Sequence, residues 1–383
     1  MARVCFISSY PPTHGRLSEY AFNLLNELQK CPFIEHIDVL ASAPSEQSFK
    51  QLNNKITVHK TWDSDNPFSI LRIPFKILRL KPDIVHFNVH MAVFGPSRIA
   101  NFVGLCLPFF SRVMGFRTVT TLHNLLEKID LEKVRFKNSL LNRISAFVVT
   151  KFISLASTVT LTVGSYVEPF KNKYKCKNVV RIPHGTWNNH NQNNYGGQKK
   201  RSTLLFFGHS GPHKDIELVL ETFKIVHGKI PNTNLVIAGA SHPNYPGYLE
   251  KYRAKTKSYD ISFRGYIPEE QLSSLFEEAD IVVLPYSTCT GTSGVAHLAS
   301  SFGTPIIATE LPEFQELSAE GCGLILSSHD PVAFAERINT VLSNPAFAKK
   351  LREQNYNFSE ERTWSRVAAS FCELYKRMLI GKK

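Results

Sequence analysis

Short apolar runs alternate with longer amphipathic stretches along almost the whole chain. The first run, Val4–Ser8, precedes a loop and then a stretch from Leu17 to Leu28 in which apolar residues recur at helical spacing. Asp330-Pro331 marks another helix start, because aspartate caps a helix and proline suits its first turn. The other runs that we expect to form strands are Asp83–Phe87, Thr118–Leu122, Thr158–Val163, Val179–Ile182, Thr203–Phe207, Leu235–Ala238, Ile261–Phe263, Ile281–Leu284, Pro305–Ala308 and Leu324–Leu326. This alternation predicts an α/β protein with parallel, doubly wound sheets.

A polar stretch without periodicity divides the strands into two series. It covers 187–201 and is rich in asparagine, glutamine and glycine, as linkers are. We therefore predict an N-terminal Rossmann-like domain over 1–186, a linker over 187–201 and a second Rossmann-like domain over 202–363. The remaining segment, 364–383, is expected to form a helix that could pack on either domain, including back on the N-terminal one. A pair of such domains binds ligands in the cleft at the carboxyl ends of the strands.

The positive charge of the chain is concentrated in its first half. The net charge is +13, and residues 1–185 hold 24 basic and 12 acidic residues, against 21 and 20 in the rest. Scattered Lys and Arg usually serve solubility, but concentration in one half favours an anionic partner such as a phosphate or an acidic membrane. We see no continuous basic stretch interleaved with stacking aromatic residues, so we expect no nucleic-acid partner.

Basic and apolar residues take separate helical faces between Pro67 and Lys81. The basic face holds Arg72, Lys76 and Arg79, and the apolar face holds Phe68, Leu71, Phe75 and Leu78. The stretches 99–114 and 134–153 also mix apolar with basic residues. A core helix with a solvated basic side would explain the first stretch. With the basic first half, however, the pattern predicts peripheral attachment to an anionic membrane surface through residues 67–150.

Three features indicate a cytoplasmic protein that meets the membrane at its inner face. The chain enters its first strand directly after Met1, so we expect no signal peptide. The most hydrophobic window, Ile99 to Phe116, is interrupted by polar residues and a proline, so we expect no spanning helix. The seven cysteines lack the spacing of zinc sites. Four of them sit in apolar stretches, as reduced core thiols do: Cys5, Cys106, Cys289 and Cys372.

Two loops could place an anion beside a helix start. Gly15 opens a helix directly after the first strand, where backbone amides can face an anion, and Arg16 adds a fixed positive charge. Gly208 and His209 follow the first strand of the second series, and Lys214 could reach a diphosphate from there. A plain turn would explain the first loop. A solvated lysine would explain the second, although a base in the first turn opposes the helix dipole.

A third loop and a histidine complete the candidates. The loop contains Thr290 and Ser293-Gly294, and the helix after it has no acidic residue in its first turn. Its amides and hydroxyls would suit a phosphate, and ordinary capping by Ser293 is compatible with that function. His123 stands at the carboxyl end of a first-domain strand, the edge that faces the expected cleft. A structural histidine would explain this position equally well.

Together these features resemble the retaining glycosyltransferases of family GT4, which have the GT-B fold of two Rossmann-like domains facing a central cleft. The resemblance covers nearly the whole chain and includes the segments Lys81–His86, Ile182–Gly185, Arg264–Leu272, Glu278–Pro285 and Trp364–Val367. It implies two catalytic residues: His123, which would hold the transferred sugar, and Lys214, which would neutralise the departing diphosphate. It implies donor-binding roles for Gly15, Arg16, Gly208, His209, Lys214, Thr290, Ser293, Gly294 and Glu316.

The chain departs from the family pattern at three places. Arg16 stands where the family has a second glycine, and no arginine precedes Lys214, where this chain has His209, Ser210 and Gly211. The family's paired glutamates, eight residues apart, fall on Thr290 and Leu298. A charge-assisted phosphate contact is worth roughly 1.5–3 kcal/mol, so the missing arginine bears on donor affinity. The missing glutamates bear on donor identity and on activity.

The resemblance therefore implies a hexosyltransferase of the EC 2.4 class that moves a sugar from a nucleoside-diphosphate sugar to a glycan or lipid-linked acceptor. Such an enzyme would serve cell-envelope polysaccharide or glycoconjugate biosynthesis. Because no aspartate pair suggests a catalytic metal, we expect neither a metal nor another cofactor. Two alternatives stay open: a sugar-nucleotide epimerase of the same fold, and a degenerate, non-catalytic homologue that acts as a binding protein.

Overall fold

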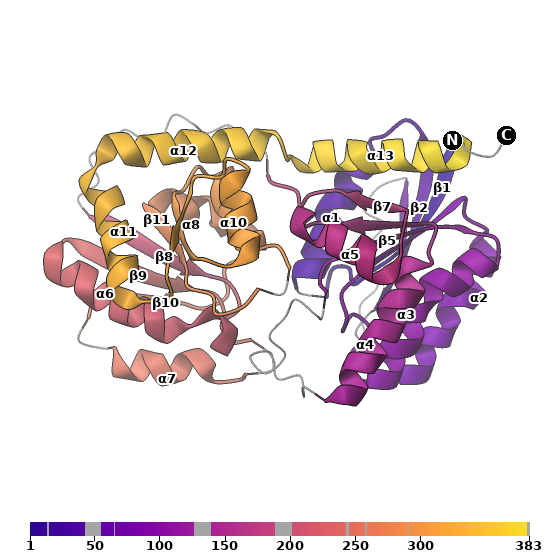
Figure 1. Ribbon diagram of the computed structural model, residues 1–383, viewed down its shortest axis with the longest axis horizontal. Helices are drawn as coiled ribbons and strands as arrows, with labels where there is room; N and C mark the ends of the chain where they lie inside the picture. The colour runs from indigo at the N-terminus through magenta and orange to yellow at the C-terminus, as the bar shows by residue number, and fades with distance from the viewer. Residues whose placement is uncertain are drawn as a thin grey trace. The chain divides into compact units, whose positions relative to one another are not determined.

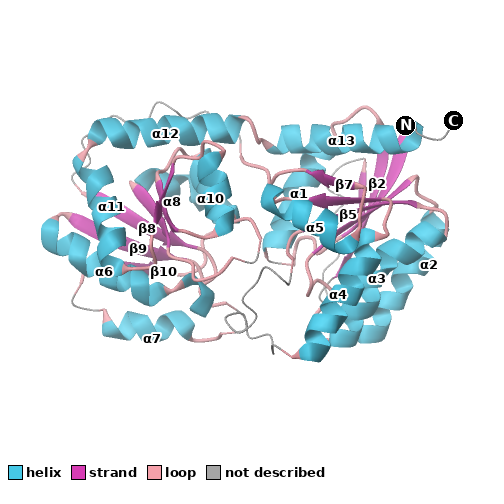
Figure 2. Cartoon of the chain, viewed as in Figure 1, coloured by secondary structure: helices cyan, strands magenta, loops and turns pink. Residues whose placement is uncertain are grey.

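The computed structural model describes residues 1–13, 15–42, 55–64, 66–125, 139–187, 201–242, 245–256, 259–289 and 291–380. These residues form two compact units (Figure 1). The first unit contains the described residues up to Gly185 together with the C-terminal helix from Trp364, and the second contains those from Thr186 to Thr363. Each unit is built around a single parallel sheet with helices packed against it (Figure 2).

The first unit has a seven-stranded sheet in the order β3-β2-β1-β4-β5-β6-β7, and all its pairings are parallel. Its strands are β1 (Ala2–Ile7), β2 (Ile34–Ser42), β3 (Ile56–Trp62), β4 (Ile84–Val89), β5 (Arg117–Leu122), β6 (Thr158–Leu161) and β7 (Val179–Arg181). Its helices are α1 (Arg16–Leu28), η1 (Pro67–Leu71), α2 (Arg72–Leu80), α3 (Arg98–Val113), α4 (Leu140–Ser154), η3 (Gly164–Tyr166), α5 (Val167–Tyr174) and α13 (Trp364–Ile380). The strand order reverses between β1 and β4, which is where doubly wound sheets bind ligands.

The second unit has a six-stranded parallel sheet in the order β10-β9-β8-β11-β12-β13. Its strands are β8 (Ser202–Phe207), β9 (Thr233–Ala238), β10 (Ile261–Arg264), β11 (Ile281–Leu284), β12 (Ile306–Thr309) and β13 (Leu324–Ser327). Its helices are η5 (Pro212–Lys214), α6 (Ile216–Lys229), α7 (Tyr248–Lys255), η6 (Glu269–Gln271), α8 (Leu272–Glu278), α9 (Gly294–Ser301), α10 (Pro312–Ala319), α11 (Pro331–Ser343) and α12 (Pro345–Glu360). The predicted α/β class with parallel, doubly wound sheets is confirmed.

The neighbouring strands β11 and β12 of the second sheet are buried at every position, which explains why they read as continuous apolar runs, whereas the edge strand β10 is only partly covered. Leu204 and Phe206 of β8 pack into one apolar cluster with α6 and α11, whereas Leu205 packs into another with α8, α9 and α10. Helix α11 begins where the sequence predicts, because the Asp330 carboxylate accepts a hydrogen bond from the Ala333 amide at 2.8 Å.

Helix α13 packs against α1 within the first unit. The Tyr375 hydroxyl lies in hydrogen-bonding contact with Nδ1 of buried His86, whose Nε2 contacts the Thr121 hydroxyl at 2.7 Å. Cys372 forms a disulfide with Cys31, which follows α1. The expectation that Cys372 is a reduced core thiol is therefore wrong. The two residues are 341 positions apart, so only the packing of α13 on α1 reveals their proximity.

Candidate functional site

A chain of polar side chains crosses the carboxyl ends of three neighbouring strands in the first unit. Ser8 follows β1, Asn88 lies in β4, and His123 follows β5. The Asn88 amide nitrogen donates to the Ser8 hydroxyl at 2.9 Å, and Asn88 Oδ1 lies 2.7 Å from His123 Nε2. Because an amide oxygen only accepts hydrogen bonds, Nε2 of neutral His123 carries the proton and Nδ1 is the acceptor nitrogen. This network fixes the orientation and the tautomer of His123.

The surroundings of His123 keep it neutral. Burial lowers the pKa of His123 well below its ordinary value, and the positive charges that His184 and His90 would carry lower it further. Burial likewise lowers the pKa of His90 and of His184 to about 4. The Tyr20 ring packs edge-on against His123 at 4.5 Å between ring centroids and against Trp364 of α13 at 5.0 Å. A neutral imidazole at this edge can bind a hydroxyl but cannot serve as a fixed cation.

The first predicted anion loop lies at the same edge of the sheet. Gly15 immediately precedes α1 with φ of 134°, a conformation that favours glycine, and it has no side chain to cap the helix. An added Cβ at Gly15 would meet nothing within 4 Å. Arg16 is exposed at the start of α1. The start of α1 therefore has no side-chain cap from Gly15, and Arg16, the first residue of the helix, is exposed at the same end.

Lys214 is fully buried at the carboxyl edge of the second sheet. It ends η5, and its Nζ donates to the carbonyl oxygen of Phe207, the last residue of β8, at 3.1 Å. The same Nζ lies 5.2 Å from the centroid of the Tyr286 ring, which follows β11. A carbonyl oxygen and an aromatic face stabilise a cation without neutralising its charge. Lys214 is thus not the solvated lysine that was the simpler interpretation of the sequence.

The start of α9 lies next to Lys214. A Cβ built on Gly208 would come within 2.7 Å of Lys214 Nζ and 3.5 Å of Val295 Cγ2, in the first turn of α9. Gly208 has φ of 103°, so both its conformation and its closeness to Nζ favour glycine. The Ser287 amide, from the loop after β11, donates to the His213 carbonyl oxygen at 2.9 Å. The loops after β8 and β11 and the first turn of α9 therefore meet around one buried ammonium group.

Imidazole rings gather near the position where the resemblance leads one to expect an arginine. The His209 and His213 rings lie 6.4 and 6.0 Å, centroid to centroid, from the ring of His242, which follows β9. His242 was not among the residues selected from the sequence. The signal that could have found it is its place after β9, since β9 neighbours β8 in a doubly wound sheet.

The predicted loop before α9 is only partly described. The Ser293 hydroxyl caps α9 by accepting from the Ala296 amide at 3.3 Å, and Gly294 is the first residue of the helix. Thr290 lies outside the described residues. Leu298, at the other position where the family has a glutamate, is buried in the apolar core. Glu316 is half-buried on α10.

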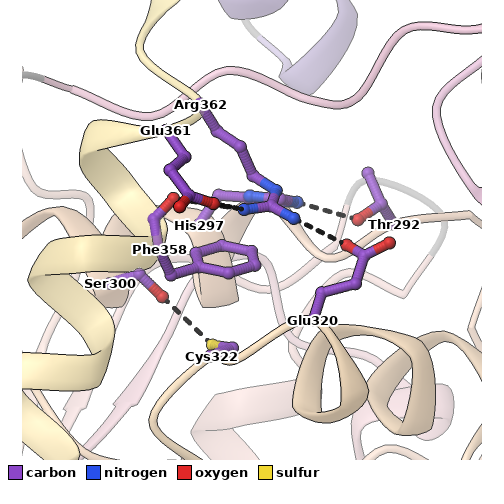
Figure 3. A network of polar contacts seen from close by, with 8 residues as sticks. All are labelled: Thr292, His297, Ser300, Glu320, Cys322, Phe358, Glu361 and Arg362. Carbon is purple, nitrogen blue, oxygen red and sulfur yellow. Dashed lines mark hydrogen bonds and ion pairs between the residues drawn. The ribbon is translucent and has the colours of Figure 1, made fainter.

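A network of polar and aromatic contacts joins α9 to its preceding loop and to α12 (Figure 3). The Thr292 hydroxyl lies 2.9 Å from Nε2 of His297, which ties the loop to its helix. The His297 ring stacks on Phe358 of α12, and the Arg362 guanidinium lies 4.0 Å from the centroid of the same ring. Arg362 also forms an ion pair with Glu320, which follows α10, at 3.0 Å. The contacts of His297 with Thr292 and Phe358 join α9 to its preceding loop and to α12.

Among the residues that the structure describes, no three His, Cys, Asp or Glu side chains are grouped to hold a metal ion.

The family model for glycosyl transferases group 1 matches residues 188–358. D-inositol 3-phosphate glycosyltransferase of Streptomyces avermitilis is 26% identical, over 45% of this chain and 39% of that protein. The chain thus spans less than half the length of this curated relative. Sucrose-phosphate synthase of Thermosynechococcus elongatus is a similar solved structure, with a TM-score of 0.77 and 18% identity over 100% of both chains. Anabaena HepE in complex with UDP-glucose has a TM-score of 0.73 and 14% identity, over 98% of this chain and 100% of that one. These likenesses confirm the expected GT-B fold.

Proposed function

We propose that this chain, whose residues 188–358 match the family model for glycosyl transferases group 1, is a retaining glycosyltransferase. Its donor would be a nucleoside-diphosphate sugar, and its acceptor a glycan or lipid-linked precursor of a cell-envelope polysaccharide or glycoconjugate. The observation that carries the proposal is the buried ammonium group of Lys214, which lies beside the first turn of α9 within the segment that the family model matches. The complex of HepE, a protein of similar fold, with UDP-glucose supports the donor class.

The second unit would bind the donor diphosphate. Amides at the start of α9, at Ser293 and Gly294, point toward its N-terminal end, where the helix dipole favours negative charge. Lys214 would contact the phosphate next to the breaking glycosidic bond. As that bond breaks, negative charge grows on the leaving nucleoside diphosphate, and a preorganised ammonium stabilises it most at that moment. Gly208 would let the phosphate approach, since any side chain there would occupy the space beside Nζ.

The first unit would bind the transferred sugar. His123 presents its unprotonated Nδ1 as an acceptor for a sugar hydroxyl, because the proton stays on Nε2, which donates its hydrogen bond to Asn88 Oδ1. Asn88 and Ser8 are positioning residues for this imidazole. Gly15 and Arg16 add amides and a positive charge that would meet an anionic part of the donor.

We also propose that the reaction needs no metal ion. Lys214 would supply the positive charge that Mg²⁺ or Mn²⁺ supplies at other diphosphate sites. Activity should therefore survive EDTA. The product should keep the anomeric configuration of the donor, and NMR of the product measures this directly. An inverted anomer would contradict the retaining mechanism.

Binding and turnover together test the proposal. Isothermal titration against a panel of nucleoside diphosphates and nucleoside-diphosphate sugars should identify one base and one sugar that bind. The panel has to be broad, because Thr290 and Leu298 replace the family's glutamates and the donor cannot be inferred from those positions. A sugar-nucleotide epimerase would turn the donor over without an acceptor, whereas a transferase needs the acceptor for full rate. If no nucleotide bound at all, the chain would be a binding protein rather than an enzyme.

A further inference from the structure

Exposed apolar side chains are concentrated on one part of the first unit. Among the described residues, 18 large hydrophobic side chains are exposed, and 13 of them lie between positions 68 and 147. They are Phe68, Leu71, Phe75 and Leu78 on η1 and α2; Ile99, Phe102, Phe110, Val113 and Met114 on or directly after α3; and Leu140, Leu141, Ile144 and Phe147 on α4. The second unit has three: Tyr259, Tyr266 and Val332. Such a concentration marks an interaction surface rather than scattered exposure.

The segment of η1 and α2 carries two separate apolar stripes. One stripe is buried against the unit and consists of Ile70, Ile73 and Ile77. The other is exposed and contains Phe68 and Phe75, which are 76% and 73% accessible. A core helix with a solvated basic side needs only the buried stripe. The exposed stripe therefore requires another explanation than packing within the chain.

The same elements are basic and contain no acidic residue. Neither η1, α2, α3 nor α4 includes an aspartate or a glutamate. On α2 the bases directly follow exposed apolar residues, as in the pairs Leu71-Arg72, Phe75-Lys76 and Leu78-Arg79. The bases on the other two helices are Arg98, Arg112, Arg143 and Lys151. An anionic bilayer can bind a surface of this kind. The apolar side chains enter the boundary between headgroups and acyl chains, and the bordering cations contact the negatively charged headgroups.

These elements are neighbours in the fold. Helix α3 packs against both α4 and η1, and α2 continues directly from η1. Figure 1 shows α2, α3 and α4 beside one another in the first unit. No described helix has the length and the apolar content that crossing a bilayer requires. The surface formed by η1, α2, α3 and α4, which we call the basic-apolar surface, is thus suited to lying on a membrane.

We propose that the basic-apolar surface docks the protein on an anionic lipid bilayer. Phe68 and Phe75 enter the acyl boundary, and Arg72, Lys76 and Arg79 contact lipid phosphates. This inference rests on exposure and charge alone and stands independently of sugar transfer. If the chain also transfers a sugar to a lipid-linked acceptor, this docking would place the first unit at the membrane in which that acceptor resides.

A second copy of the chain fits this surface poorly. In a two-fold dimer the same surface would face itself, and the exposed bases of α2, α3 and α4, which include Arg72, Arg79, Arg98 and Arg143, would approach one another without any acidic partner from those helices. Like charges in a contact of this kind repel each other. An anionic bilayer supplies the missing negative charge.

Vesicle sedimentation tests the docking. The full chain should sediment with vesicles of phosphatidylcholine mixed with phosphatidylglycerol, sediment little with phosphatidylcholine alone, and be released as salt rises. In the variant Phe68→Ser/Phe75→Ser, the lipid concentration for half-binding should rise about tenfold for each phenylalanine. Arg72→Gln/Arg79→Gln should raise it about fivefold for each charge removed. Unchanged circular dichroism spectra show that the variants are folded.

The matched control is a pair of exposed residues in the second unit, Val332→Ser and Lys349→Gln, which should leave vesicle binding unchanged. Equal binding to neutral vesicles, or no effect of either variant of the basic-apolar surface, would overturn the proposal. A dimer in solution that Phe68→Ser/Phe75→Ser dissociates, with no vesicle binding, would assign the surface to self-association. Sugar transfer to a water-soluble acceptor is measured in parallel. Vesicle binding without sugar transfer would contradict the proposed function and leave the docking proposal standing.

Discussion

Replacing Lys214 with methionine should impair catalysis without impairing the fold. Methionine keeps most of the apolar volume of the buried side chain and removes only its ammonium group. In the folded protein that group gains a carbonyl contact at 3.1 Å and lies 5.2 Å from the Tyr286 ring. Exchanging a buried charge for a well-packed apolar group is often neutral or stabilising, so the free energy of unfolding should change by about 1 kcal/mol or less.

The kinetic effect of Lys214→Met should be much larger. A charge-assisted contact to phosphate contributes about 1.5–3 kcal/mol, which corresponds to roughly a 10- to 150-fold loss in kcat/KM for the donor. Lys214→Ala should lose about 100-fold or more, because it also leaves a cavity beside the site. The assay is release of the nucleoside diphosphate under limiting donor, together with urea unfolding of each variant.

Lys224→Met is the control for this experiment. Lys224 lies on α6 in the same unit and pairs with Glu221 on the surface, so its loss should leave kcat/KM unchanged. If Lys214→Met kept kcat/KM within about threefold of the parent while binding its donor normally, the ammonium group would be structural. The role proposed for Lys214 would then be wrong.

Four further predictions concern both units. His123→Ala should lower turnover far more than affinity for the bare nucleotide, as measured by steady-state kinetics and titration calorimetry; equal losses would mean that the residue does not meet the sugar. Gly303→Ala should destabilise the chain by about 1–3 kcal/mol in urea unfolding, because φ is +65° and the new Cβ would lie 2.4 Å from the Tyr356 ring. Gly228→Ala, on α6 with open space around it, should instead stabilise the chain by about 0.5–1 kcal/mol. Burial lowers the pKa of His86 to about 3. Between pH 6.5 and pH 3, His86 is therefore protonated in the unfolded chain and neutral in the folded chain. Unfolding free energy should fall by about 1.4 kcal/mol per pH unit from this residue, and His86→Gln should make the measured decline in Tm shallower.

The apolar pattern was sufficient to predict most of the strands. All six strands of the second sheet fall on predicted runs. The reason is clearest for β11 and β12, because strands covered on both faces of a parallel sheet need apolar residues at nearly every position. Strands β2 and β3 were missed. Asp38 interrupts the apolar run of β2 and is nevertheless buried, since it lies 2.7 Å from His59 Nε2 and 3.7 Å from an Arg3 nitrogen. These partners come from β3 and β1, so only strand pairing makes Asp38 tolerable inside the sheet.

The candidate site divides in the same way. Local pattern placed His123 and Lys214 after strands, where doubly wound sheets present functional side chains. It did not reveal Asn88 and Ser8, because hydrogen bonds between neighbouring strands join residues 35 and 80 positions apart. His242 was missed because its place after β9 matters only once β9 is known to neighbour β8.

The sequence by itself therefore determined the class of fold, the order of most elements and the types of residue at the strand ends, because each follows from local periodicity and turn chemistry. The tertiary structure decided which of those residues are buried and which of them meet. Helical spacing shows two apolar stripes from Phe68 to Leu78, but it cannot say which one the core takes up. Packing buries Ile73 and its neighbours, leaves Phe75 exposed, and buries Lys214. Burial depends on what the rest of the chain places over a residue, and no local window contains that information.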